Sequence, residues 1–135
     1  MLENWQRKAT MLSEMEEFDT VEVNFLDHKE EIQNAFFEIC KPLEGLYHIE
    51  LDKEKTSITI CGKTYTLNIK EDTISIIYES HYEQKFIIFK DNNGVKKYRY
   101  AHRVTLDEEM YLSQYTLNYK SILNTLMNNA FQNIR

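Results

Sequence analysis

The sequence predicts a single α+β domain in which helices cover one face of an antiparallel meander sheet. Two observations predict it: an alternation of period two from Leu46 to Val104, and helical spacing of apolar residues on both sides of that region. The connections between the alternating runs are too short for crossover helices, so neighbouring strands must be antiparallel. Three glycines and one proline in 135 residues leave no linker, so we expect residues 1–135 to form one domain.

Two helices are expected before the sheet. The first is indicated by apolar residues at helical spacing, which are Leu2, Trp5, Ala9, Leu12 and Met15. The second begins at a capping box formed by Asp27 and Glu30 and ends before Pro42 and Gly45. Between them, residues 20–26 alternate as a short strand does, and would add a seventh strand to the sheet.

The sheet is expected to hold six strands, within residues 46–51, 56–61, 64–69, 73–78, 85–90 and 96–104. Their alternation predicts one apolar face and one largely hydrated face. Residues 85–90 are apolar on both sides, so this strand is either central with both faces covered or exposes an apolar patch. Asn93-Gly94 and Gly62-Lys63 are candidate hairpin turns, because such turns need positive φ.

A last helix is expected from a capping box at Thr105 and Glu108, running to the carboxyl terminus. Its apolar positions follow helical spacing and include Leu112, Tyr115, Tyr119, Ile122 and Leu126. The order of elements from residue 20 onward is similar to the helix-grip topology, in which a curved antiparallel sheet wraps a long terminal helix. This resemblance implies a ligand cavity between the sheet and the last helix.

Residues able to carry chemistry show no catalytic, metal-binding or phosphate-binding pattern. The four histidines and two cysteines lack the spacing of metal ligands. Adjacent carboxylates such as Glu30 and Glu31 are expected on solvated helix faces, and no glycine-rich loop is present to hold a phosphate. We therefore expect no cofactor and no metal, and an enzyme is less favoured than a binding protein. Cys61, beside a tight turn and a lysine, is either reactive or an inert strand-end residue.

The basic run of residues 96–103 separates into two sides when it is divided with a period of two. Tyr98, Tyr100 and His102 share one side, while Lys97, Arg99 and Arg103 form a basic ridge on the other. The ridge has three interpretations: protection of a sheet edge, contact with an acidic protein partner, or contact with nucleic acid. A net charge of −6 disfavours nucleic acid, and the tyrosines do not share a surface with the cations as a base-stacking platform would require.

The last helix offers a second candidate surface, at Tyr115, Tyr119, Ile122 and Leu126. These residues either pack on the chain's own sheet or, at the far end of the helix, pair with a second copy or another protein. A homodimer through this helix is therefore one of the expectations.

The sequence favours a non-enzymatic protein-binding module, such as a small inhibitor, an immunity-type protein, a phage counter-defence factor or a chaperone-like protein. One alternative is a helix-grip-like binder of a small apolar ligand. Another is a nucleic-acid binder acting through residues 96–103. The amino terminus lacks the apolar core of a signal peptide, and no apolar stretch is long enough to span a membrane. We therefore expect an acidic cytoplasmic protein with no membrane contact and another protein as its partner. Its composition, rich in Asn, Ile, Lys and Tyr and poor in Ala and Gly, is typical of AT-rich bacterial or phage genomes and indicates such an origin.

Overall fold

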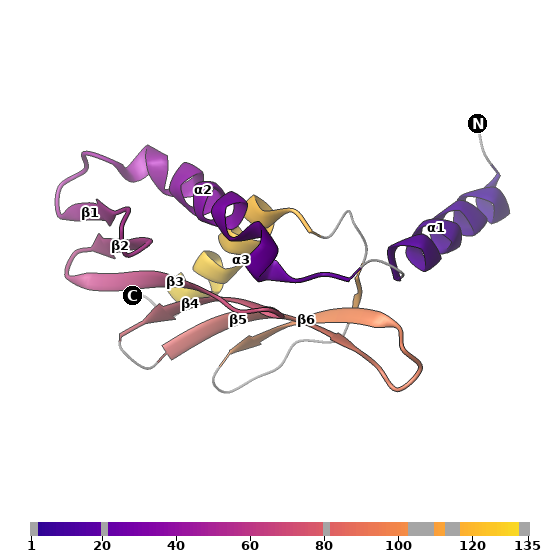
Figure 1. Ribbon diagram of the computed structural model, residues 1–135. Helices are drawn as coiled ribbons and strands as arrows, with labels where there is room; N and C mark the ends of the chain where they lie inside the picture. The colour runs from indigo at the N-terminus through magenta and orange to yellow at the C-terminus, as the bar shows by residue number, and fades with distance from the viewer. Residues whose placement is uncertain (1–2, 20–21, 80–81, 103–109, 113–116, 133–135) are drawn as a thin grey trace.

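The computed structural model describes residues 3–19, 22–79, 82–102, 110–112 and 117–132. Its helices are α1 (Asn4–Asp19), the 3-10 helix η1 (Phe25–His28), α2 (Lys29–Cys40), the 3-10 helix η2 (Lys41–Leu43) and α3 (Tyr119–Phe131). Figure 1 shows α2 and α3 over one face of the sheet, whereas α1 points away from the rest of the molecule. The α+β class and the packing of the carboxyl-terminal helix on the sheet are confirmed, but α1 does not join that layer.

The sheet is an antiparallel meander whose strands follow one another in chain order. The strands are β1 (Ile49–Asp52), β2 (Ser57–Ile60), β3 (Lys63–Ile69), β4 (Thr73–Tyr78), β5 (Tyr82–Lys90), β6 (Lys96–His102) and β7 (Met110–Tyr111). The six predicted strands are all present. The seventh is a two-residue addition beside β6, where Tyr98 pairs with Met110, and it does not come from residues 20–26.

Residues 22–24 lead into η1 rather than into a strand. The Asn24 side chain caps η1 by accepting a hydrogen bond from the Leu26 backbone N–H at 3.0 Å. A backbone hydrogen bond from Phe25 N–H to the Glu71 carbonyl, at 2.9 Å, joins this segment to the β3–β4 connection without continuing a strand ladder. The expected strand at residues 20–26 is therefore wrong for residues 22–26, while residues 20 and 21 lie outside the described part.

The register of the strands places the apolar residues on the face that the alternation predicts. Ile74 lies beside Phe86, which in turn lies beside Tyr100. Their rings and side chains meet Phe25 and Phe36 from the helical layer in one core. Each fully buried side chain of this size stabilises the fold by roughly 1.5–3 kcal/mol, so the sheet and the two packed helices form a single hydrophobic unit.

Two hairpin turns differ from the predicted ones. The β2–β3 turn is Cys61-Gly62, where φ is +50° and +87°, as a two-residue hairpin turn needs. In the β5–β6 connection only Gly94 has positive φ. That loop is held instead by Asp91, whose side chain accepts hydrogen bonds from the N–H groups of Asn93 (2.8 Å) and Val95 (3.0 Å).

The last helix is shorter than predicted and begins later. Met110 and Tyr111 extend the sheet, and α3 begins at Tyr119, where the Asn118 side chain accepts a hydrogen bond from the Ser121 N–H at 3.0 Å. At about 1.5 Å per residue its 13 residues span about 20 Å, and the helix packs on β4 and β5. A helix running on from Thr105 is wrong, because Met110 and Tyr111 form a strand. Residues 103–109 lie outside the described part.

Candidate functional site

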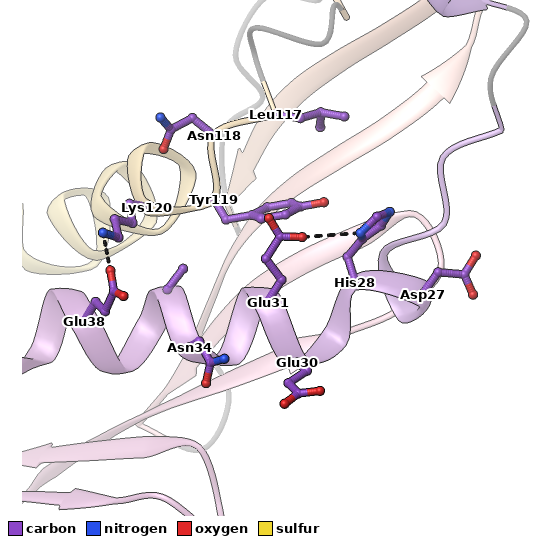
Figure 2. A pocket seen from close by; sticks show the side chains of 11 residues that line it. Asp27, His28, Glu30, Glu31, Asn34, Glu38, Leu117, Asn118, Tyr119 and Lys120 are labelled. Carbon is purple, nitrogen blue, oxygen red and sulfur yellow. Dashed lines mark ion pairs between the residues drawn. The ribbon is translucent and has the colours of Figure 1, made fainter.

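An open groove of about 810 Å³ lies between α2 and the start of α3. Figure 2 shows the side chains that line it. Its charged residues are Asp27, Glu30, Glu31, Glu38 and Lys120, with His28 at one end. Four carboxylates and one ammonium group therefore line it, and a hollow lined mainly by one sign of charge concentrates the electric field within it.

The sequence builds this groove by placing polar residues along one side of η1 and α2. Asp27, Glu31, Asn34 and Glu38 are separated by four, three and four positions, which is the spacing of neighbours on one helix face. The adjoining face of α2 carries its buried residues, Ile32, Ala35, Phe36 and Cys40, of which Ala35 also lines the groove. Burial of that face fixes the direction of the carboxylate stripe, and α3 supplies the other wall.

Interactions within the groove hold two of its carboxylates. His28 Nδ1 lies 3.4 Å from Glu31 Oε2, and the Lys120 ammonium forms an ion pair with Glu38 that bridges α3 and α2 (Figure 2). Tyr119 forms part of the wall, and burial together with the charge of Glu31 raises the pKa of its hydroxyl. Most of the groove's lining thus comes from η1, α2 and the start of α3, with Leu117 and Asn118 in the segment just before α3, and lining on helices favours a fixed geometry.

The basic ridge lies on the sheet face opposite the helices. Lys97 Nζ is 3.3 Å from Asp91 Oδ2, and the Arg99 guanidinium lies over the Phe89 ring, 5.2 Å from its centroid. Lys85 on β5 pairs in register with Ala101 and adds a further cation to this face. Arg103, the third predicted member of the ridge, lies outside the described residues.

The outer sides of β4 and β5 add apolar area to the same face. Ile77, Ile87 and Phe89 are half-buried there, while α2 and α3 lie on the other face (Figure 1). Two interpretations were open for residues 85–90: a strand covered on both faces, or an apolar patch on the outer face. The structure fits the second, because neither α2 nor α3 covers the outer face of this strand.

The predicted helix interface lies inside the molecule. Tyr119, Ile122 and Leu126 are 9%, 1% and 0% exposed and belong to the core between α3 and the sheet. Tyr115 lies outside the described residues. The three described side chains therefore pack on the chain's own sheet, which is the first of the two interpretations of this surface.

A second hollow, of about 670 Å³, lies along β1 at the edge of the sheet. Its carboxylates are those of Glu44, Glu50, Asp52 and Glu54, and it also contains Lys53 and Lys55. Two cations balance part of its negative charge, so it is less one-sided than the groove between α2 and α3.

The two cysteines occupy contrasting places. Cys61 is exposed in its turn, while Cys40 is buried at the end of α2. Burial, with a smaller contribution from Glu44, raises the pKa of the Cys40 thiol to about 11, so this thiol is neutral at pH 7. Among the described residues, no three histidine, cysteine, aspartate or glutamate side chains gather in a way that could hold a metal ion.

The acidic groove was not among the predicted sites, although its sequence signal was present. The stripe from Asp27 to Glu38 has regular helical spacing, but a solvated helix face has the same pattern. Comparison with protein-family models, curated proteins and solved structures finds no match. None of the described helices is both long enough and apolar enough to cross a membrane.

Proposed function

We propose that this chain is a non-enzymatic protein-binding module whose groove between α2 and α3 receives a basic segment of another protein. The observation that carries this proposal is the charge of the groove: four carboxylates and one lysine line a hollow of about 810 Å³. Complementary charge raises the rate of association and selects against acidic partners. The partner is therefore expected to present lysine or arginine side chains.

The rigidity of both walls supports a binding role. Ile32 and Phe36 anchor α2, and Ile122 and Leu126 anchor α3, all at 0–1% exposure. A partner would therefore meet carboxylates whose helices are already fixed, so little ordering would be required on binding. Small inhibitors, immunity-type proteins, phage counter-defence factors and chaperone-like proteins act through preformed surfaces of this kind, and a cytoplasmic location remains part of the proposal.

The two alternatives receive less support. A helix-grip-like ligand binder would need a cavity between the sheet and α3, but there the Tyr65 ring stacks on Phe131 with centroids 4.9 Å apart. Fully buried Leu123 and Leu126 also occupy that layer. A nucleic-acid binder would have to use the cations of the outer sheet face. The tyrosines of β6 lie on the other face of the sheet, so they cannot stack on bases beside those cations.

The proposal is tested by affinity capture with the full chain as bait. Removing three groove charges, with Asp27→Asn, Glu31→Gln and Glu38→Gln together, is expected to abolish capture of a basic partner that the unmodified chain retains. Quantitative mass spectrometry measures the partner, and raising the salt concentration is expected to weaken capture because the groove is open to solvent.

A matched variant controls for the loss of total charge. Glu44→Gln, Glu50→Gln and Glu54→Gln remove the same number of carboxylates from the second hollow and are expected to leave capture unchanged. Equal capture by the groove variant and the unmodified chain would overturn the proposal, as would a partner lost only in the control.

A further inference from the structure

The amino-terminal helix α1 is the one described helix that stands apart from the core. Figure 1 shows it extending away from the sheet. Trp5, Met11 and Leu12 are 69%, 56% and 59% exposed, and no described α1 side chain belongs to the core cluster. Large apolar side chains gathered on one exposed element mark an interaction surface.

Charge along α1 is divided between its two halves. From Asn4 to Ser13 the helix carries Arg7 and Lys8 and no carboxylate. From Glu14 to Asp19 it carries four carboxylates and no cation. This division of charge restricts the partner more than the apolar residues do. A uniformly basic partner would be attracted only by the second half of α1, and a uniformly acidic partner only by the first half.

A second copy of α1 offers the reciprocal arrangement. In an antiparallel pair, the basic half of each helix lies beside the acidic half of the other, and the contact is the same for both copies. A parallel pair would set like charges together, at a cost. Trp5 and Leu12, seven residues apart, lie on one side of the helix and supply an apolar stripe for such a pair.

We propose that α1 is a dimerisation arm that pairs antiparallel with α1 of a second copy of this chain. The division of charge sets the direction of pairing, and the exposed apolar residues supply the contact. The two-fold symmetry of such a pair lets one surface serve both subunits. This inference does not depend on the acidic groove, which lies between α2 and α3.

The test measures the association of the full chain by sedimentation velocity from low micromolar to several hundred micromolar concentrations. Trp5 is the single tryptophan, so its fluorescence reports burial of α1 directly. We expect a monomer–dimer equilibrium, with emission shifting to shorter wavelength as the dimer forms. A chain that stays monomeric throughout would overturn the proposal.

Charge reversal tests the direction of pairing. Arg7→Glu with Lys8→Glu makes the arm wholly acidic and is expected to raise the dissociation constant at least about tenfold. Glu14→Lys, Glu16→Lys and Glu17→Lys make the second half basic and are expected to do the same. Mixing the two variants is expected to restore assembly as a mixed dimer, a result that misfolding of either variant cannot produce.

A matched control applies the same charge change elsewhere. Lys53→Glu with Lys55→Glu, both exposed in the β1–β2 connection, is expected to leave the dissociation constant unchanged. If assembly survives the Arg7 and Lys8 reversal but disappears with Lys97→Glu, the arm docks on the outer sheet face instead. That outcome would overturn the antiparallel pairing.

Discussion

Helices α1 and α2 both lie within the first forty residues and both carry apolar side chains at helical spacing, yet only α2 is built into the domain. Phe36 in α2 is 0% exposed, whereas Leu12 in α1 is 59% exposed. The contrast teaches that spacing identifies which side of a helix is apolar without identifying what covers it. The apolar side of α2 packs on the core of the same chain. In the proposed dimer, the apolar side of α1 would pack on α1 of a second copy.

The largest expected difference between the two helices is in stability. Phe36→Ala is expected to lower the free energy of unfolding by about 3–5 kcal/mol, because it leaves a cavity in the core. Leu12→Ala, measured in dilute solution where the chain is monomeric, is expected to change it by less than about 0.5 kcal/mol. Urea denaturation followed by circular dichroism measures both values. Comparable losses in the two variants would show that α1 belongs to the core.

Alkaline pH is expected to weaken the α2 side of the molecule through Cys40. The folded thiol has a pKa of about 11 against an ordinary value of 9.0, so the folded chain keeps a proton that the unfolded chain loses. Its contribution is complete below pH 9 and is lost as pH rises towards 11, by roughly 2–3 kcal/mol at most. Denaturation midpoints at several pH values measure this loss.

The matched variant for this pH dependence is Cys40→Ala. Its stability is expected to fall less steeply between pH 9 and 11 than that of the unmodified chain. Some decline remains, because burial also raises the pKa of Tyr65 and Tyr119. Identical slopes would mean that the Cys40 thiol is not protected from ionisation by the fold.

The wall of the groove that α3 supplies depends on its cap. Asn118→Ala removes the bond to the Ser121 N–H and is expected to cost about 1 kcal/mol of unfolding free energy. Asn124→Ala, at an exposed position inside the same helix, is expected to be neutral or slightly stabilising because alanine is the better helix former. Thermal or urea unfolding distinguishes the two, and an equal effect would argue against the capping role.

The smallest expected effect concerns the ion pair across the groove. Lys120 and Glu38 are both more than half exposed, so Lys120→Ala is expected to change the unfolding free energy by less than about 1 kcal/mol. The same variant removes the one lysine of the groove and is expected to strengthen capture of a basic partner. Weaker capture would show that the groove does not act through its negative charge.

Most of the sheet could be predicted because each strand must place its apolar residues on one face. Ile58, Leu67, Ile76 and Ile88 all lie where the alternation places them, and all are buried. The predicted first strand starts too early, at residue 46. His48 has a φ of +59°, which interrupts the extended backbone, and the alternation of apolar residues gives no sign of this. β1 consequently begins at Ile49, and Tyr47 is exposed.

The end of the chain shows a different limit. Leu112 falls in helical spacing with Tyr119, yet it is buried beside β6, where its N–H donates to the Lys96 carbonyl at 3.0 Å. Strand pairing therefore replaced the helix that local spacing and a capping pattern had indicated. The strand signal in two residues is too short to compete with a helical pattern in the sequence.

The groove could not be predicted because it needs two elements that are far apart in the chain. The stripe of Asp27, Glu31 and Glu38 was visible, but only the packing of α3 turns it into one wall of a hollow. The basic ridge, by contrast, follows from alternation along a single strand, and Lys97 and Arg99 lie on the predicted side.

Hydrogen exchange of the full chain at low and high protein concentration tests the contrast between α1 and the other helices most directly. At low concentration the amides of α1 are expected to exchange rapidly, while those of α2 and α3 stay protected by the core. At high concentration α1 alone is expected to gain protection as the dimer forms. Protection of α1 equal to that of α2 at the lowest concentration, or none gained at the highest, would contradict this account.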